Sequence, residues 1–146
     1  MQFFPSLATE SNSLAGIERF NQHLAEFGFT YFAVDELVTG NWIGFIGLLR
    51  QSYESPWTPF VDIGWRLIRS HWGQGLATEG ALGCLNFARD HTDLKEVFAT
   101  ASWKNLPSIN VMGKIGMEHV GEFTHPTFDA QHELQPIVTY RIQLNR

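Results

Sequence analysis

Two glycines, Gly73 and Gly75, form a turn between an alternating segment and an amphipathic one. The alternation over residues 60–68 predicts a β-strand, and the pattern over residues 74–90 predicts a helix. A glycine-rich turn lets a ligand approach the backbone closely, and the helix after it has about four N–H groups without intrahelical partners. Together with the helix dipole, these donors favour a phosphate or a similar anion. The same glycines are also compatible with a tight turn that binds nothing.

Asp62 and Ser108 are polar side chains at positions where apolar ones would be ordinary. Asp62 lies inside the expected strand on the same side as Gly64 and Arg66, where it is either a solvent-facing residue or a functional group. Ser108 shares a helical face with apolar residues, which directs its hydroxyl inward, toward the glycine turn. The alternative for Ser108 is a hydroxyl that caps the start of its helix. These residues alone leave both alternatives open.

Two motifs together resemble one family. The sequence W-G-Q-G-L-A-T-E at residues 72–79 is followed, after a second expected strand at 96–103, by N-L-P-S-I-N-V-M-G-K-I-G-M at residues 105–117. This pairing is similar to the GNAT acetyltransferases, in the RimJ/RimL-like branch that includes ribosomal-protein N-terminal acetyltransferases. The resemblance covers roughly residues 3–144. It implies an α+β fold with a mixed, mostly antiparallel sheet.

The resemblance implies an acetyl-CoA-dependent N-acetyltransferase that moves an acetyl group to a primary amine by direct attack in a ternary complex. The acceptor would be a small molecule or a protein N-terminus. The alternative is a non-catalytic module of the same fold that binds acyl-CoA. An unrelated nucleotide-phosphate site ranks last, because the chain lacks the Lys-Ser/Thr of a P-loop and an acidic set for magnesium.

The same resemblance implies which residues hold the cofactor. Its pyrophosphate would rest on backbone amides of the turn and the first helical residues, namely Trp72, Gly73, Gln74, Gly75, Leu76 and Ala77. The amides of Arg66 and Ile68 would bond the pantetheine arm, and one of them would polarise the acetyl carbonyl. Asn105 would position the cofactor. Ser70 stands where the family motif usually has Gln or Arg, so one side-chain contact is expected to be missing.

Acetyl transfer needs a deprotonated amine and a proton source for the departing thiolate. By resemblance, Asp62 stands at a strand position where an acidic residue often draws the proton from the amine, sometimes through water. Its reference pKa of about 3.9 suits a water-mediated relay or an amine ligand unless burial raises that value. Ser108 would hydrogen-bond or protonate the thiolate. Many GNAT branches use a tyrosine there, but Tyr140 falls in the final strand and does not match that place.

Composition is typical of a globular domain. With 146 residues, 44% hydrophobic and 17% charged, the chain is expected to form one domain over residues 1–146. The net charge of −5 and the scattered Lys and Arg argue against a nucleic-acid partner. Dispersed histidines predict no metal site, and Cys84 falls on the apolar face of its helix. Four tryptophans near the motifs are expected to line the core or a pocket: Trp57, Trp65, Trp72 and Trp103.

The pattern along the chain predicts the elements that position these residues. They form a mixed sheet with a central βαβ unit and flanking helices. The expected elements are helix 13–27, strands 30–35 and 42–49, a loop at 51–59 able to border a substrate cleft, strand 60–68, helix 74–90, strand 96–103, helix 106–115, and strands 117–123 and 136–144.

The N-terminal segment departs from the family pattern. GNAT domains normally begin with a strand and a helix before the matched segment at Phe3, so we expect the chain to lack that unit. The strand at 30–37 would then have an unpaired edge, and such edges are usually covered or paired. We therefore expect a homodimer or a cover formed by residues 1–12. No signal peptide is recognised and no apolar run approaches ~20 residues, so we expect no membrane partner and a cytoplasmic location.

Overall fold

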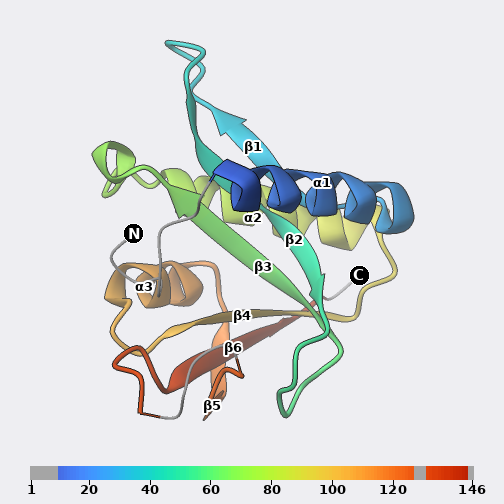
Figure 1. Ribbon diagram of the computed structural model, residues 1–146, viewed down its shortest axis with the longest axis vertical. Helices are drawn as coiled ribbons and strands as arrows, with labels where there is room; N and C mark the ends of the chain where they lie inside the picture. Colours follow the sequence, from blue (N-terminus) through green and yellow to red (C-terminus); the bar gives the residue numbers. More distant parts are fainter. Residues whose placement is uncertain (1–9, 127–130, 145–146) are drawn as a thin grey trace.

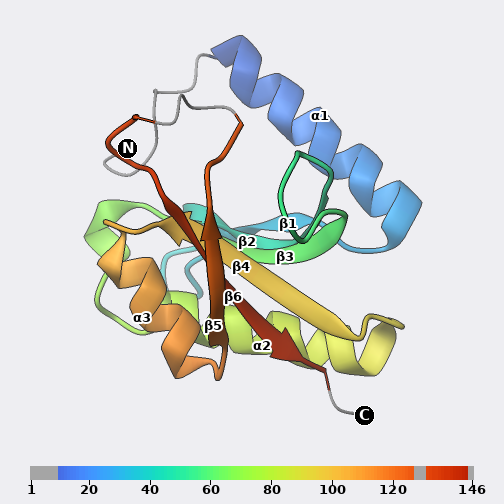
Figure 2. The ribbon, with the colours of Figure 1, turned by 90° about the horizontal axis from the view of Figure 1, so that it is seen from below.

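The computed structural model describes residues 10–126 and 131–144. A six-stranded sheet with the strand order β1-β2-β3-β4-β6-β5 forms the middle of the molecule (Figure 1). Helix α1 covers one face of the sheet, and α2 and α3 cover the other (Figure 2). The elements are α1 (Glu10–Phe27), β1 (Tyr31–Asp35), β2 (Trp42–Gln51), β3 (Phe60–Leu67), α2 (Leu76–His91), β4 (Glu96–Ser102), α3 (Leu106–Lys114), β5 (Glu118–Phe123) and β6 (Ile137–Gln143).

The structure confirms the predicted fold class, an α+β fold with a mixed and mostly antiparallel sheet. Each expected helix and strand is present, with ends that differ by a few residues. Helix α1 begins at Glu10 rather than at residue 13, and α2 begins at Leu76 rather than at residue 74. A 3₁₀ helix at Arg69–His71 was not predicted, because three residues are too few to show a periodicity of their own.

Strands β3 and β4 are parallel neighbours that pair at Asp62 and Phe98. Beyond this point the two strands diverge toward their C-terminal ends, as Figure 1 shows. Helix α2 joins β3 to β4, and α3 follows β4, so both helices begin near the ends that have separated. The divergence therefore leaves room between the strand ends for a site that both helices border.

The core between the sheet and α2 depends on a row of apolar helical residues. Three of them recur at helical spacing and are fully buried: Ala81, Leu85 and Ala88. At Gly80 an added Cβ would lie 2.4 Å from Cδ1 of Ile46 on β2, so the helix lies as close to the sheet as this glycine allows. Cys84 is half-buried against the same core, and burial raises the pKa of its thiol. This is the setting of a packing residue and not of a nucleophile.

Helix α1 contacts the opposite face of the sheet through Phe20. The Phe20 ring centroid lies 5.3 Å from that of Tyr31 and 5.8 Å from that of Phe45. The rest of the predicted apolar stripe is less well covered, since Ile17 is 55% exposed and Leu24 is 37% exposed. The helix is held to this face by the Phe20 ring and by His23, whose Nε2 accepts the Arg50 N–H of β2 at 2.9 Å, and it leaves apolar surface beside them.

Strand β1 lies at the edge of the sheet, and β2 is its one neighbour within the described part of the chain. The unpaired edge expected near residues 30–37 is present there. Phe32 on this strand is 47% exposed. Of the cover expected from residues 1–12, residues 10–12 belong to α1, and residues 1–9 lie outside the described residues.

Candidate functional site

A cavity of about 410 Å³ opens where β3 ends and where α2 and α3 begin. Its walls are the end of β3, the glycine turn with the first turn of α2, and α3. It brings together most of the predicted site residues: Arg66, Trp72, Gly73, Gly75, Leu76, Ala77, Asn105 and Ser108. Asp62, Ile68 and Gln74, which were predicted with them, do not line it.

The glycine turn has the backbone conformation that requires glycine. Gly73 has φ +74° and Gly75 has φ +77°, both in the left-handed region. An added Cβ at either position would meet no described atom within 4 Å, so the constraint is the backbone angle and not crowding within the protein. Gly75 is also the N-cap of α2, and no side chain caps that helix. The first N–H groups of α2 are thus left for a ligand that lines up with the helix axis.

Two of the predicted backbone donors are already used within the protein. The Ile68 N–H donates to the carbonyl oxygen of Ile43 at 2.8 Å, which closes the end of the β2–β3 pair. The Trp72 N–H donates to the carbonyl oxygen of Arg69 at 3.1 Å within the 3₁₀ turn. Both amides are therefore satisfied, in contrast to the expectation that they donate to a ligand. The amides of residues 73–77 remain as the group that can hold an anion.

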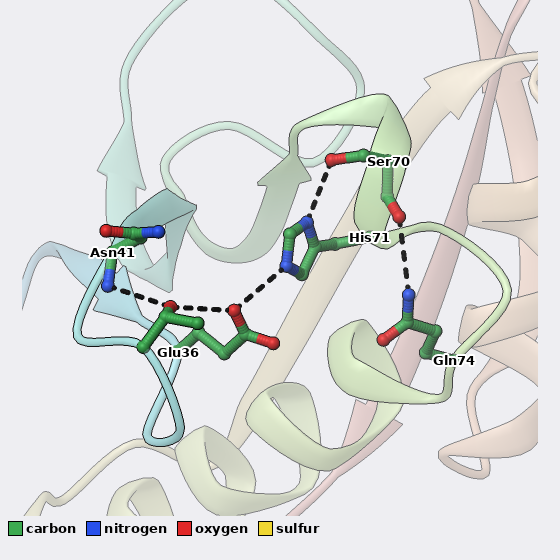
Figure 3. Close-up of polar contacts among 6 residues, drawn as sticks. Glu36, Asn41, Ser70, His71 and Gln74 are labelled. Carbon is green, nitrogen blue, oxygen red and sulfur yellow. Dashed lines mark hydrogen bonds and ion pairs between the residues drawn. The ribbon is translucent and has the colours of Figure 1, made fainter.

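A polar network ties the hairpin between β1 and β2 to the turn before α2 (Figure 3). Glu36 in the hairpin forms an ion pair with Nε2 of His71 at 3.4 Å and accepts a hydrogen bond from Thr39 at 2.8 Å. Ser70 Oγ lies 3.0 Å from Nδ1 of His71, and Gln74 Nε2 donates to the Ser70 carbonyl oxygen at 3.3 Å. The Thr39 bond and then the His71 contact lower the pKa of Glu36. Ser70 and Gln74 therefore support the turn with their polar groups.

The cavity favours anions although the whole chain is acidic. Arg66, His71 and Lys114 line it, and none of the described residues in its wall is Asp or Glu. Partial burial lowers the pKa of Arg66, but a guanidinium stays charged at any physiological pH. With a net charge of −5 on the chain, a cavity without carboxylates is a local exception. The absence of carboxylates from the described residues of this wall and the uncapped helix start act in the same direction.

Helix α3 resolves the two alternatives for Ser108. Asn105 is the N-cap, because its Oδ1 accepts the Ser108 N–H at 3.3 Å. The Ser108 hydroxyl is therefore not the cap. Its Oγ instead accepts a hydrogen bond from Nε1 of Trp65 at 3.3 Å, and both side chains line the cavity. The predicted inward hydroxyl is present, and Trp65, which was expected to line the core or a pocket, is also its hydrogen-bond donor.

Asp62 is 6% exposed, so it is not a solvent-facing strand residue. Tyr31 donates its hydroxyl proton to Asp62 Oδ1, and Gln51 Nε2 donates to Oδ2 at 2.8 Å. Burial raises the pKa of Asp62 to about 6, and these two hydrogen bonds oppose the rise. Sequence reasoning missed both partners, since Tyr31 and Gln51 belong to other strands.

The structure does not place Asp62 beside Ser108. Asp62 precedes the cavity-lining Arg66 by four residues along β3, which is about 13 Å in an extended strand. Its carboxylate meets Tyr31, which packs against Phe20 of α1, whereas Ser108 belongs to α3 on the other face. The two candidate reacting groups thus lie on opposite faces of the sheet.

In residues 10–126 and 131–144, no helix is long and apolar enough to cross a bilayer. The same residues contain no group of three His, Cys, Asp or Glu side chains placed to hold a metal ion.

Comparisons with known proteins agree with this geometry. The sequence profile of the family described as "Acetyltransferase (GNAT) domain" matches residues 1–118. Among curated proteins, the uncharacterized protein YkkB of Bacillus subtilis is 30% identical over 93 residues, which are 64% of this chain and 53% of YkkB. The chain thus spans about half the length of that relative.

Solved structures show the same fold. A GNAT-family acetyltransferase from Bacillus anthracis has a TM-score of 0.75 and 22% identity, and the match covers 100% of this chain and 82% of that one. Spermidine N-acetyltransferase from Vibrio cholerae, solved in complex with CoA and spermine, has a TM-score of 0.72 and 17% identity, over 99% of this chain and 82% of that one.

Proposed function

Since the chain belongs to the GNAT acetyltransferase family, we propose that it is an acetyl-CoA-dependent N-acetyltransferase whose acceptor is a primary amine. The observation that carries the proposal is the cavity itself. It has no carboxylate among its described wall residues, and it lies at an uncapped helix start behind two glycines of positive φ. Such a cavity suits a ligand with a pyrophosphate group.

The residues present fit the cofactor. The amides of residues 73–77 would hold the pyrophosphate, because they lie at the start of α2 and lack a side-chain cap. Asn105 uses its Oδ1 for the cap of α3, which leaves its NH₂ group to donate toward the cavity. Arg66 would contribute from β3. When bound, acetyl-CoA supplies a thioester whose carbonyl carbon an amine can attack directly.

Two side chains supply the proton chemistry of the proposed reaction. Ser108 presents its hydroxyl to the cavity and hydrogen-bonds the departing sulfur. Asp62 accepts the proton of the amine, a role that its pKa of about 6 suits better than an ordinary value of 3.8. Asp62 is buried and does not line the cavity, so the proton reaches it by way of the Tyr31 hydroxyl that is bonded to Oδ1. The Tyr31 hydroxyl accepts a proton from the amine while it passes its own to Oδ1.

The proposal also covers the class of amine acceptor and the oligomeric state of the protein. We keep the RimJ/RimL-like branch because of the two motifs at residues 72–79 and 105–117, which leaves a protein N-terminus and a small-molecule amine as acceptor classes. The Vibrio cholerae neighbour makes polyamines a sensible part of an acceptor panel. We also propose that the exposed edge of β1 pairs two copies of the chain as a homodimer.

The proposal is tested by binding and by release of free thiol. We expect acetyl-CoA to raise the melting temperature, by an amount that corresponds to roughly 2.7 kcal/mol at 100 times its dissociation constant. We then expect thiol release with at least one member of a panel of polyamines, simple amines and peptides with free N-termini. Binding without release from any acceptor would indicate a non-catalytic acyl-CoA module. No thermal shift at about millimolar acetyl-CoA would overturn the cofactor assignment.

The role of Asp62 is tested by Asp62→Asn. The variant should lower the rate by about tenfold or more and should remove the rise of rate with pH near 6, while the thermal shift with acetyl-CoA stays. Asp35→Asn, at the other end of β1 from Tyr31, is the matched control and should leave the rate unchanged. A rate and a pH profile equal to those of the parent would remove Asp62 from the mechanism.

A further inference from the structure

Trp65 and Ser108 are 43 residues apart in the sequence, yet they form a direct link across the cavity. The indole Nε1–H of Trp65 on β3 donates to Oγ of Ser108 on α3 at 3.3 Å. The indole ring is half-buried and packs against the core, so its position is fixed by neighbours other than Ser108. The link therefore joins a fixed donor to a hydroxyl at the cavity wall.

The hydrogen-bonding capacity of the two groups sets the direction of the Ser108 proton. An indole N–H donates only, whereas a hydroxyl has one donor and two acceptor sites. Because Trp65 fills an acceptor site of Oγ, the Ser108 hydroxyl must send its own proton elsewhere. The described residues offer it no acceptor, and the Ser108 backbone N–H is already bonded to Asn105. The direction left to the proton is into the cavity.

We infer that Trp65 is a positioning residue, which holds the Ser108 hydroxyl as a hydrogen-bond donor aimed into the cavity. This inference rests on the proposed function, in which negative charge develops on the departing sulfur. A hydroxyl that accepts a hydrogen bond is polarised and becomes a stronger donor. Ser108 keeps its proton in this scheme and stabilises the charge by donating a hydrogen bond. Trp65 acts on the reaction through this hydrogen bond to Ser108.

Trp65→Phe separates the hydrogen bond from the packing, because phenylalanine keeps an aromatic ring and lacks the N–H. We expect this variant to lower kcat about three- to tenfold, while the KM for acetyl-CoA changes less than about twofold. Trp103→Phe is the matched control. Trp103 is 48% exposed and does not line the cavity, so its variant should keep the parent kcat.

A double-mutant cycle with Ser108→Ala tests whether Trp65 acts through Ser108. If it does, Trp65→Phe lowers kcat in the parent and has no further effect in Ser108→Ala. Ser108→Thr, which restores a hydroxyl, should restore the sensitivity to Trp65→Phe. Equal losses in both backgrounds, or an unchanged kcat in Trp65→Phe, would overturn the inference. Absence of thiol release from the parent would instead overturn the proposed function.

The hydrogen bond also has a readout that needs no catalysis. The five tryptophans give separate indole N–H resonances, and Trp65→Phe identifies the one from Trp65. In Ser108→Ala we expect this resonance to shift upfield and its proton to exchange faster with solvent, while the Trp103 resonance stays in place. A Trp65 resonance that does not respond to Ser108→Ala would overturn the inference, even if Trp65→Phe proved too unstable to assay.

Discussion

Tyr31 on β1 reaches across β2 and donates its hydroxyl proton to Asp62 on β3. Gly64 makes this reach possible, since an added Cβ there would lie 2.7 Å from the Tyr31 hydroxyl oxygen. Burial, and then the charge of Asp62, raise the pKa of Tyr31 well above its ordinary range, so the tyrosine stays protonated and remains a donor. Tyr31 and the buried carboxyl of Asp62 thus share one hydrogen-bonded proton.

The raised pKa of Asp62 should make the protein less stable as the pH rises from about 4 to about 6. The carboxyl has an ordinary value of 3.8 and a folded value of about 6, so between these values the folded state holds a proton that the unfolded chain has released. Above about pH 6 the buried carboxylate is ionised, and it lowers the free energy of unfolding by an amount on the order of 3 kcal/mol. Asp62→Asn removes this titration. Urea unfolding measures the free energy of unfolding of both proteins. The value for Asp62→Asn minus the value for the parent should increase from pH 4 to 6 and stay constant above pH 6. A difference that is independent of pH would contradict the assignment.

Gly64→Ala should displace Tyr31 from Asp62. We expect the free energy of unfolding to fall by about 1–3 kcal/mol, because the new methyl group would overlap the Tyr31 ring and hydroxyl. Gly83→Ala is the control, since a Cβ at Gly83 of α2 meets nothing within 4 Å and alanine favours a helix. Thermal unfolding of the two variants measures the contrast. Equal stability of Gly64→Ala and the parent would mean that the Tyr31 side chain can adopt another position at no cost in free energy.

Gly73→Val and Gly75→Val should abolish the thermal shift with acetyl-CoA. Both glycines have positive φ, so valine strains the turn and also puts a branched side chain where the pyrophosphate would approach. Gly40→Val is a matched control, because Gly40 has φ +72° with equally open surroundings but lies in the hairpin between β1 and β2. All three variants should have a similarly lowered melting temperature without ligand. Only Gly73→Val and Gly75→Val should lose the thermal shift with acetyl-CoA. Normal binding by both turn variants would move the anion site elsewhere.

The exposed edge of β1 should pair with a second copy of the chain. Light scattering is expected to give the mass of a dimer, and the amides of residues 31–35 should exchange slowly with solvent. Phe32→Lys, which puts a charge on a side chain that is 47% exposed, should give a monomer whose edge amides exchange faster. A parent monomer with protected edge amides would be incompatible with this assembly.

The parts of the site that follow from the sequence are local in the chain. The strand, the glycine turn and the helix start lie within one run of residues, and the positive φ of Gly73 and Gly75 is what the pattern of glycines predicts. The inward direction of Ser108 follows from helical spacing. Its choice between capping and lining was settled by Asn105, which lies only three residues away.

The remaining contacts depend on how distant segments meet. The register of β1, β2 and β3 determines that Tyr31 reaches Asp62, and no short-range pattern shows that register. The same holds for the Ile68 amide, which is used by the carbonyl of Ile43 on β2. Glu36 meets His71 because the hairpin folds toward the turn before α2. The burial of Asp62 also results from the packing of β1, β2 and β3 around it. Its raised pKa therefore could not be predicted from its residue type.

Gly80 couples the hydrophobic core to the ligand cavity. An α-helix moves as a rigid rod over a few turns, and Gly80 lies only about one turn from Leu76, where α2 begins. A side chain at position 80 would collide with Ile46 and move the N-terminal end of α2 away from the sheet. The amides of residues 73–77 would move with it. Core substitutions at this point should therefore change ligand affinity without touching a ligand. The distance between α2 and the sheet at Gly80 therefore determines the position of the amides that form the anion site.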